Sequence, residues 1–405
     1  MKREIRGFII GVVVMAFLSG TFAFASQGTK IIEAFYDDIS IFIYGNEITP
    51  TDANGEIVEP FRYNGTTYLP VRAISEALGM PVYWDEAAKN VYLGDLPTEF
   101  RRQLLDALIK LYEDEQITEV TVSTVDEFIS ELGSNKTIYL KPGVYNLSES
   151  DVQLEGNVYW EYVYDGGELT FDNIVNLKII GDENGGTEII TNPRYSEIFN
   201  FEACGNITIQ NIKAGHTPEE YECDAGVFYF YDSVNIVVDN CYLYGCGATG
   251  VTLYDVNGFS CNNTIITDCS LRGAYIHAST DVIFNNTQII KNRAYASAIS
   301  VAYESEVEFI DCEISENNNI EWSLFETTEA SKLTLTNCII RNNQNSMEDS
   351  PCMFDTYGYG NFESGKIILN NCIIENNKTW VEYGGEKPIY NDSTFKGNVF
   401  LTDEE

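Results

Sequence analysis

Histidine, positive charge and long apolar runs are all scarce in this chain of 405 residues. His216 and His277 are its only histidines, which excludes a three-histidine zinc site and leaves few candidates for a histidine-based triad. The 24 Lys and Arg residues face 62 Asp and Glu residues, so the net charge is −38. Such a charge argues against a nucleic-acid-binding protein and against docking on anionic lipid, because both need a basic surface.

The N-terminus has the organisation of a secretory signal peptide. Residues 2–6 are rich in Lys and Arg, residues 7–18 are apolar, and Ala23-Phe24-Ala25 offers small residues for signal peptidase. The alternative interpretation is an uncleaved N-terminal anchor. No second apolar stretch of about 20 residues follows, so we expect no membrane span in the mature chain. The prediction is cleavage after residues 1–25 and a protein that is secreted or held at the cell surface.

Residues 31–95 predict a small α+β module of short strands and one helix. Pro70 opens the helix at its first turn and Gly79 ends it, and a hairpin follows over residues 82–93. This segment resembles the copper amine oxidase-like N-terminal domain of exported bacterial proteins, on the motifs Tyr68-Leu69-Pro70-Val71-Arg72, Glu76-Ala77-Leu78-Gly79 and Trp84-Asp85. Residues 26–95 contain neither His nor Cys, so we expect a stalk or interaction module that binds no copper.

A short segment, residues 96–118, separates this module from the rest of the chain. Its apolar residues recur at helical spacing: Phe100, Leu104, Leu105, Leu108 and Leu111. We expect an exposed helical spacer.

Residues 120–402 repeat a short motif with a period of 21 to 34 residues. The units carry alternating strands and turns rich in Gly and Asn, which leave no room for a helix, so they predict a parallel β-solenoid. Strict alternation places one set of apolar pairs on a single face of the coils. These pairs are Ile236/Val238, Phe259/Cys261, Val282/Phe284, Val307/Phe309, Leu333/Leu335 and Ile367/Leu369.

Two columns of polar residues accompany the apolar ones. Stacked amides can satisfy one another inside an apolar tube, where each unpaired amide would cost about 1–3 kcal/mol. The first column is Asn211, Asn240, Asn263, Asn286, Asp311, Asn337, Asn371 and Asp392. The second column is Asn292, Asn317, Asn343, Asn377 and Asn398.

These columns, the coil length and the opening segment Val125–Glu149 resemble the right-handed parallel β-helix of the pectin lyase-like superfamily. The fold class expected is therefore mainly β, a right-handed β-helix preceded by the small module and the spacer helix. The resemblance says little about function, because this fold hosts lyases, hydrolases, epimerases, adhesins and tail-spike proteins.

All ten cysteines lie inside the predicted β-helix. Cys241, Cys312, Cys338 and Cys372 share one column, where a small apolar residue suits a tight inward corner, so we favour a stack of free thiols. The alternative is a set of disulfides, because neighbouring coils lie about 4.8 Å apart, within the Cα range of a disulfide. Cys246–Cys269 is then the first choice.

Outward residues of one strand per coil form the candidate binding surface. Alternation assigns Tyr229, Tyr231, Tyr254, Tyr275 and His277 to one outer face. In pectin lyase-like enzymes this sheet carries the substrate groove, and Tyr rings stack on sugars while their hydroxyls form hydrogen bonds. The alternative is that outward Tyr merely favours strands. The basic residues Lys291 and Arg293 come from turns that lead into the same face, and we assign them to ligand binding.

Catalysis and metal binding have weaker signals. Polysaccharide lyases of this fold use Arg or Lys as a base or charge stabiliser, which the resemblance would assign to Arg272. Asp232 and Asp255 are one coil apart, hence about 5 Å, the spacing of a retaining glycosidase. Glu222 and Asp224, in an acidic loop, are candidate ligands of Ca²⁺, a hard cation that prefers oxygen.

Three functional hypotheses remain open at this point. The first is an exported or cell-surface protein whose β-helix binds extracellular polysaccharide. The second is a polysaccharide lyase or glycoside hydrolase that acts in the outer groove. The third is a purely structural adhesion protein. The sequence also predicts that an anionic polymer would be repelled unless Ca²⁺ or the cluster of Arg272, Lys291 and Arg293 intervenes.

Overall fold

A computed structural model describes residues 32–44, 46–52, 56–78, 80, 82–85, 89–94, 98–112, 116–218, 222–245, 247–346, 352–357 and 363–401. The predicted signal peptide lies outside these residues. The chain divides into two compact units, of which the first ends at Leu104 and the second begins at Leu105. In the described part of the chain, no helix has the length and apolar character needed to cross a membrane.

The described residues of the first unit form three antiparallel hairpins and a short helix. The predicted hairpin over residues 82–93 is present, with Trp84 opposite Val91, and the predicted helix begins directly after Pro70. The predicted helix end at Gly79 lies outside the described residues. The elements are β1 (Ile41–Ile43), β2 (Asn46–Ile48), β3 (Phe61–Tyr63), β4 (Thr66–Tyr68), α2 (Val71–Ala77), β5 (Val82–Asp85) and β6 (Asn90–Leu93).

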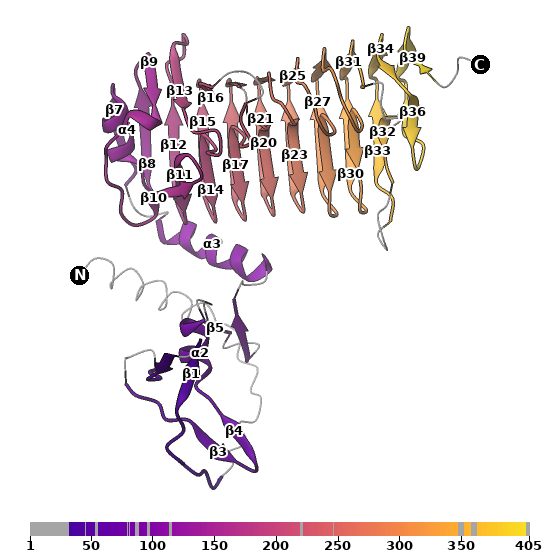
Figure 1. Ribbon diagram of the computed structural model, residues 1–405. Helices are drawn as coiled ribbons and strands as arrows, with labels where there is room; N and C mark the ends of the chain where they lie inside the picture. Colours follow the sequence, from indigo (N-terminus) through magenta and orange to yellow (C-terminus); the bar gives the residue numbers. More distant parts are fainter. Residues whose placement is uncertain are drawn as a thin grey trace. The chain divides into compact units, whose positions relative to one another are not determined.

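The second unit is a parallel β-solenoid, and each coil contributes one strand to each of three sheets (Figure 1). The sheet that carries the predicted outward tyrosines is named the tyrosine sheet. Its strands are parallel except for the antiparallel hairpin at its N-terminal end. In spatial order they are β10 (Val158–Val163), β11 (Gly166–Asp172), β14 (Phe199–Glu202), β17 (Phe228–Tyr231), β20 (Thr249–Tyr254), β23 (Arg272–His277), β26 (Ile299–Ala302), β29 (Phe325–Thr327), β32 (Cys352–Asp355) and β36 (Val381–Gly384).

The second sheet contains the apolar pairs predicted from the repeat. All of these residues are buried, and each pair lies in register with the pair of the next coil. The strands are β7 (Thr118–Val122), β8 (Lys136–Leu140), β12 (Val175–Ile180), β15 (Gly205–Gln210), β18 (Val234–Asp239), β21 (Asn257–Asn262), β24 (Thr280–Asn285), β27 (Glu306–Ile310), β30 (Lys332–Thr336), β33 (Lys366–Asn370) and β37 (Ile389–Asn391).

The third sheet completes each coil, and a helix closes its N-terminal end. Phe128 and Ile129 of α4 (Val125–Glu131) are fully buried in the core, so this helix caps the first coil. The strands are β9 (Gly143–Asn146), β13 (Thr187–Thr191), β16 (Lys213–His216), β19 (Tyr242–Tyr244), β22 (Ile265–Thr267), β25 (Gln288–Ile290), β28 (Glu313–Ser315), β31 (Ile339–Arg341), β34 (Ile373–Glu375) and β38 (Thr394–Lys396). Shorter elements are η1 (Leu147–Glu149) and the pair β35 (Lys378–Thr379) and β39 (Val399–Phe400).

Helix α3 (Thr98–Tyr112) is not exposed along its whole length, so the prediction of an exposed spacer is wrong for its C-terminal half. Leu105 is buried against Val175 and Val234, which lie at the starts of β12 and β18. Ile109 lies so close to Gly205 that a side chain there would come within 2.8 Å of it. Leu105, Leu108 and Ile109 are thus covered because they shield apolar residues at one margin of the second sheet, whereas Leu111 is exposed.

The two polar columns have different places. Residues of the first column have left-handed backbone, such as Asn240 with φ of 50°, and their side chains stack on the outside of the coils. They do not enter the tube, because the positive φ turns the side chain away from it. Residues of the second column are inside: the Asn317 amide is fully buried and donates to Asn343 Oδ1 at 2.9 Å and to the Ile289 carbonyl at 3.0 Å.

The cysteine column is a stack of buried free thiols, as predicted. The proposed Cys246–Cys269 disulfide is wrong, because Cys269 is free and fully buried, whereas Cys223 forms a disulfide. Cys246 lies outside the described residues. The Cys269 backbone N–H donates to Asn292 Oδ1 at 3.0 Å, which places Cys269 at the top of the internal Asn column.

The internal column predicts a large stability effect at Asn317. Replacing Asn317 by Ala removes the acceptor of two bonds from Asn292 and the donor to Asn343, so it leaves several buried polar groups unpaired. We expect the free energy of unfolding to fall by about 2–4 kcal/mol, measured by urea denaturation. Replacing the exposed neighbour Asn318 by Ala should cost less than about 0.5 kcal/mol. Equal losses in the two variants would contradict this role of the column.

Candidate functional site

The outer face of the tyrosine sheet brings together most of the residues predicted for the site. Tyr229 of β17 lies in register with Thr252 and Tyr275, and the next outward column contains Tyr231, Tyr254 and His277. The alternating residues between them, such as Phe228 and Phe230, are fully buried. The alternation that favours a strand therefore also places these side chains on one surface, at successive coils.

The aromatic side chains of this face form a continuous row. His277 stacks on Tyr254 at a centroid distance of 4.0 Å, and Tyr254 lies 6.4 Å from Tyr231 and 6.0 Å from Tyr275. On the other side, His277 contacts Tyr303 at 4.1 Å. We call these five residues the ring row. Sequence reasoning missed Tyr303, because it follows β26 in a left-handed turn with φ of 55° and so leaves the strand alternation.

His277 is held as a neutral imidazole between two tyrosine rings. Burial lowers its pKa, and the nearby Asp255 carboxylate only partly opposes this effect. Its Nδ1 atom is buried and has no hydrogen-bond partner among the described residues. His277 thus contributes a flat, uncharged ring with an unused nitrogen to the row.

Arg272 supplies a positive charge at the edge of the ring row. Its guanidinium carbon lies 5.0 Å from the centroid of the Tyr275 ring, in cation–π contact. Burial lowers the Arg272 pKa, while the Glu326 carboxylate opposes this effect. Glu326 is itself fixed, because it accepts a hydrogen bond from Ser300 Oγ at 2.7 Å. Arg272 therefore remains a cation, suited to stabilise charge beside the row.

Asp232 and Asp255 occupy equivalent turns of neighbouring coils, directly after β17 and β20. Both have left-handed backbone, with φ of 50° and 55°. Their N–H groups donate to the next coil, that of Asp232 to the Tyr254 carbonyl and that of Asp255 to the His277 carbonyl. Turn formation accounts for an Asp at each position, since Asp tolerates this backbone. A catalytic pairing of the two stays a prediction.

The remaining predicted residues lie on turns and a loop. Lys291 is exposed at the end of β25, and Arg293 packs over Tyr295 at 5.0 Å, both on the turn that leads into β26. The Glu222 carboxylate pairs with Arg194 at 3.1 Å. The carboxylate of Asp224 accepts a hydrogen bond from the Tyr195 hydroxyl and so raises the Tyr195 pKa.

Calcium binding in that loop stays a prediction. Within the ranges that the structure describes, no three or more His, Cys, Asp and Glu side chains are arranged to hold a metal ion. Two further carboxylates of the loop, Glu219 and Glu220, lie outside those ranges.

A group of carboxylates that sequence reasoning missed lies on the same face, toward the N-terminal end. Asn200 occupies the register of Tyr229, and Glu202 that of Tyr231. The Asn200 amide nitrogen donates to Glu168 Oε1 at 2.9 Å and to Glu202 Oε1 at 3.3 Å. The N–H of Glu197 donates to Glu168 Oε2 at 2.6 Å. We call Glu168, Glu197 and Glu202, with Asn200 between them, the acidic cluster.

The pKa values of all three carboxyl groups in the acidic cluster are raised. Burial raises the pKa of Glu197 to about 8, with a further contribution from the negative charge of Glu168. Its Oε2 atom is buried and has no partner within the described part of the chain. Burial also raises the pKa of Glu168 and of Glu202. Glu197 therefore holds a proton at neutral pH beside carboxylates whose protons are more easily lost, which separates a potential acid from a potential base.

Sequence signals existed for part of this cluster. Extending the column alignment one coil upstream would have found Asn200 and Glu202 on the tyrosine face. Glu197 precedes its strand, and nothing in its neighbours along the chain indicates burial.

Comparison with protein families identifies the family of the second unit. The family described as right handed beta helix region matches residues 138–319 and 225–401, which is more than half of the chain. The chain belongs to this family. The first unit is covered by a second match, to the copper amine oxidase N-terminal domain over residues 23–126. No curated protein matches the chain significantly.

Solved structures that are similar to the chain have low sequence identity. ORF18 of Geobacillus virus E2 is 13% identical, with a TM-score of 0.45, over 80% of this chain and 68% of that one. The pectate lyase Pel9A is 12% identical, with a TM-score of 0.40, over 71% and 81%. PfbA, a surface adhesin of Streptococcus pneumoniae, is 12% identical, with a TM-score of 0.32, over 74% and 87%.

The half-buried Glu197, whose Oε2 atom is buried, gives this β-helix a pH-dependent stability. Its pKa is about 8 when folded and 4.5 in the reference state, so between these values the folded protein binds a proton that the unfolded chain releases. Stability from this group is then lost as pH rises. Replacing Glu197 by Gln removes this loss. As pH rises, the free energy of unfolding of the variant should therefore increase relative to that of the wild type by up to about 1.4 kcal/mol per pH unit, and the difference should level off above pH 8.

Urea denaturation between pH 5.5 and 8.5 measures this difference. The exposed Glu308 on β27 of the second sheet provides the control, because it takes no part in the acidic cluster and Glu308→Gln should leave the pH dependence of the wild type unchanged. A Glu197→Gln variant whose stability follows the wild type across the range would show that Glu197 is ionised when folded.

Proposed function

We propose that the outer face of the tyrosine sheet binds an extracellular polysaccharide. The observation that carries this proposal is the ring row, which runs across successive coils from Tyr231 to Tyr303. Aromatic rings offer flat apolar area to the C–H faces of sugars, and their hydroxyl groups form hydrogen bonds with sugar hydroxyls. A polymer that crosses the strands would meet one ring per coil, which suits a repeating ligand.

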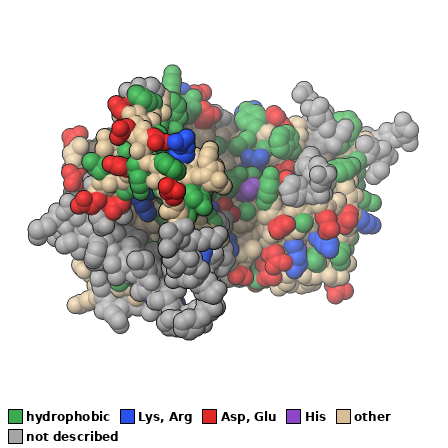
Figure 2. Space-filling model, turned by 90° about the horizontal axis from the view of Figure 1, so that it is seen from below, with side chains coloured by type: hydrophobic (Ala, Val, Ile, Leu, Met, Phe, Trp, Pro, Cys, Tyr) green, Lys and Arg blue, Asp and Glu red, His purple; other side chains and the backbone are tan. Residues whose placement is uncertain are grey.

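The charges around the row favour a neutral polymer. A net charge of −38 repels polyanions within a Debye length of about 8 Å at physiological salt. On the face seen in Figure 2, Lys and Arg side chains are interspersed with Asp and Glu side chains. Arg272 already makes a cation–π contact with Tyr275 and interacts electrostatically with the Glu326 carboxylate. A neutral glycan needs no such compensation.

Export and display complete the proposal. The basic and apolar N-terminus supports secretion or cell-surface attachment, and the copper amine oxidase N-terminal domain would act as a stalk. Residues 26–95 contain neither His nor Cys, so this domain is proposed to work without copper.

Removing rings from the row tests the binding function. A glycan array identifies the ligand of the wild type, and titration with that glycan compares the variants. Tyr254→Ala and Tyr275→Ala should each weaken binding about tenfold, because each ring contributes about 1–2 kcal/mol at a contact. Tyr242→Ala on the third sheet, also a partly exposed tyrosine, should have no effect. Unchanged affinity in both row variants, or no glycan bound at all, would favour a purely structural adhesion protein.

The acidic cluster favours hydrolysis as a second candidate function. Glu197 carries a proton at neutral pH, as a general acid must, and Glu168 or Glu202 would act as the base or nucleophile. Glu197 would protonate the departing glycosidic oxygen while water or the second carboxylate attacks the anomeric carbon. A lyase would instead need a base beside a uronic acid, the role predicted for Arg272.

Product analysis separates these two chemistries from simple binding. Incubation with the glycans found on the array should release reducing ends if the protein hydrolyses them, and Glu197→Gln should reduce the rate by at least 100-fold. Incubation with uronic-acid polymers, with and without Ca²⁺, should produce ultraviolet-absorbing unsaturated ends only if the protein is a lyase. The Arg272→Ala variant should then lose that absorbance. Absence of both products leaves binding as the function.

A further inference from the structure

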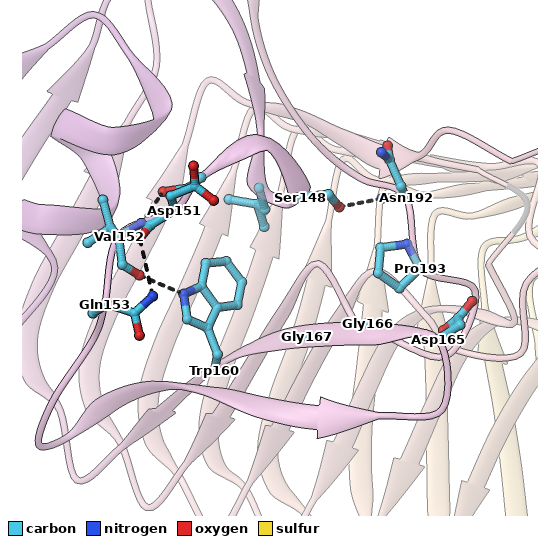
Figure 3. A pocket seen from close by; sticks show the side chains of 12 residues that line it. Ser148, Asp151, Val152, Gln153, Trp160, Asp165, Gly166, Gly167, Asn192 and Pro193 are labelled. Atoms are coloured by element: carbon cyan, nitrogen blue, oxygen red, sulfur yellow. Dashed lines mark hydrogen bonds between the residues drawn. The ribbon is translucent and has the colours of Figure 1, made fainter.

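A cavity of about 440 Å³ lies at the N-terminal end of the β-helix, and none of the residues predicted for the site lines it (Figure 3). It is open to solvent and is lined by the β10–β11 hairpin, the segment 147–153 and the segment that contains Asn192 and Pro193. Its volume lies within the range of about 300–1,000 Å³ that is typical of small-molecule sites. The cavity is therefore large enough for a sugar ring and small enough to select one.

The indole of Trp160 forms the centre of this cavity. Its Nε1–H donates to the Val152 carbonyl at 3.1 Å, which fixes the plane of the ring. The hairpin backbone approaches closely on either side, because the positions next to the turn are glycines. A side chain at Gly167 would contact the indole at 3.4 Å, and one at Gly166 would lie 2.4 Å from Pro193. The ring is thus held rigidly, as a stacking platform needs to be.

Polar groups surround the indole on two sides. In Figure 3, Asp151 and Gln153 lie on one side of the ring, and Ser148, Asn192 and Asp165 on the other. The Asp165 carboxylate accepts the N–H groups of Arg194 at 2.7 Å and Tyr195 at 3.3 Å, so its position is fixed. Carboxylates, amides and a hydroxyl around an aromatic face match the alternating apolar and hydroxyl surfaces of a pyranose.

The charge of the lining selects against anionic ligands. Asp151 and Asp165 contribute two carboxylates, and the described lining residues include no Lys or Arg. A uronic acid or a phosphate would therefore be repelled. The exposed rings of Tyr164 and Tyr195, 5.3 Å apart, add further aromatic area on the adjoining hairpin turn and the segment after Pro193.

We propose that this cavity binds one neutral pyranose ring, stacked on Trp160 and hydrogen-bonded by Asp151 and Asn192. The site is separate from the ring row and does not depend on it. The segment from Pro193 to Glu197 nevertheless joins the two regions, because Pro193 lines the cavity and Glu197 belongs to the acidic cluster.

Tryptophan fluorescence of the full-length protein tests the proposal. Separate titrations use D-glucose, D-galactose, D-mannose and N-acetyl-D-glucosamine, with D-galacturonate as the anionic comparison. At least one neutral sugar should change the emission with a dissociation constant in the millimolar range, and galacturonate should bind at least tenfold more weakly. No response to any of the neutral sugars, or equally tight binding of galacturonate, would overturn the proposal.

Two sets of variants locate the response. Trp160→Phe should abolish the emission change, whereas Trp322→Phe, at an exposed tryptophan, should keep it. Because Trp160 also packs on the core, the exposed pair Asp151→Ala and Asn192→Ala provides a second measurement by calorimetry, with at least fivefold weaker binding of the same sugar expected. Tyr254→Ala and Tyr275→Ala should bind the monosaccharide normally. Binding that is lost in these tyrosine variants but kept in Asp151→Ala would assign the sugar to the ring row and overturn the proposal.

Discussion

Hydrogen bonding between successive coils is the constraint on which the rest of the structure depends. The backbone of each coil pairs with the next, and the internal Asn column repeats this pairing with side chains, from Asn292 through Asn317 and Asn343 to Asn377. An amide in an apolar interior is tolerated only when both of its groups have partners. The column therefore fixes the register of the coils from Asn292 to Asn398, because a coil shifted by one residue would leave amides unpaired above and below.

The fixed register turns distant positions of the sequence into neighbours on the surface. Tyr231, Tyr254 and His277 are separated by 23 residues from one to the next, yet their rings form a continuous row. The same stacking brings Asn200 and Glu202 to the positions that tyrosines occupy one coil later. One face thus changes from carboxylates to aromatic rings along its length, and a ligand that lies across the strands meets both chemistries in order.

The N-terminal end of the β-helix departs from this regularity, and it holds the features that repetition does not explain. The antiparallel β10–β11 hairpin replaces a parallel coil and opens the cavity around Trp160. Burial beneath neighbouring segments keeps Glu197 protonated, and α3 covers Val175 and Val234. In solenoids the terminal coils lack a neighbour on one side, so they need covering segments with sequences of their own. Such covering segments form cavities and partly buried sites that a flat sheet alone does not have.

The sequence by itself determined the β-helix, the buried apolar columns and the outward direction of the tyrosines, because each follows from local alternation and turn residues that repeat coil after coil. The tertiary structure decided the features that depend on contacts between segments remote in the chain. Asn240 and Asn317 look alike in the sequence, and only the backbone φ decides that one lies outside the tube and the other inside. The tertiary structure also decides that Cys269 is free, that Tyr303 joins the ring row and that the Glu197 Oε2 atom is buried. Each of these outcomes depends on contacts with residues remote in the chain, and no local pattern records them.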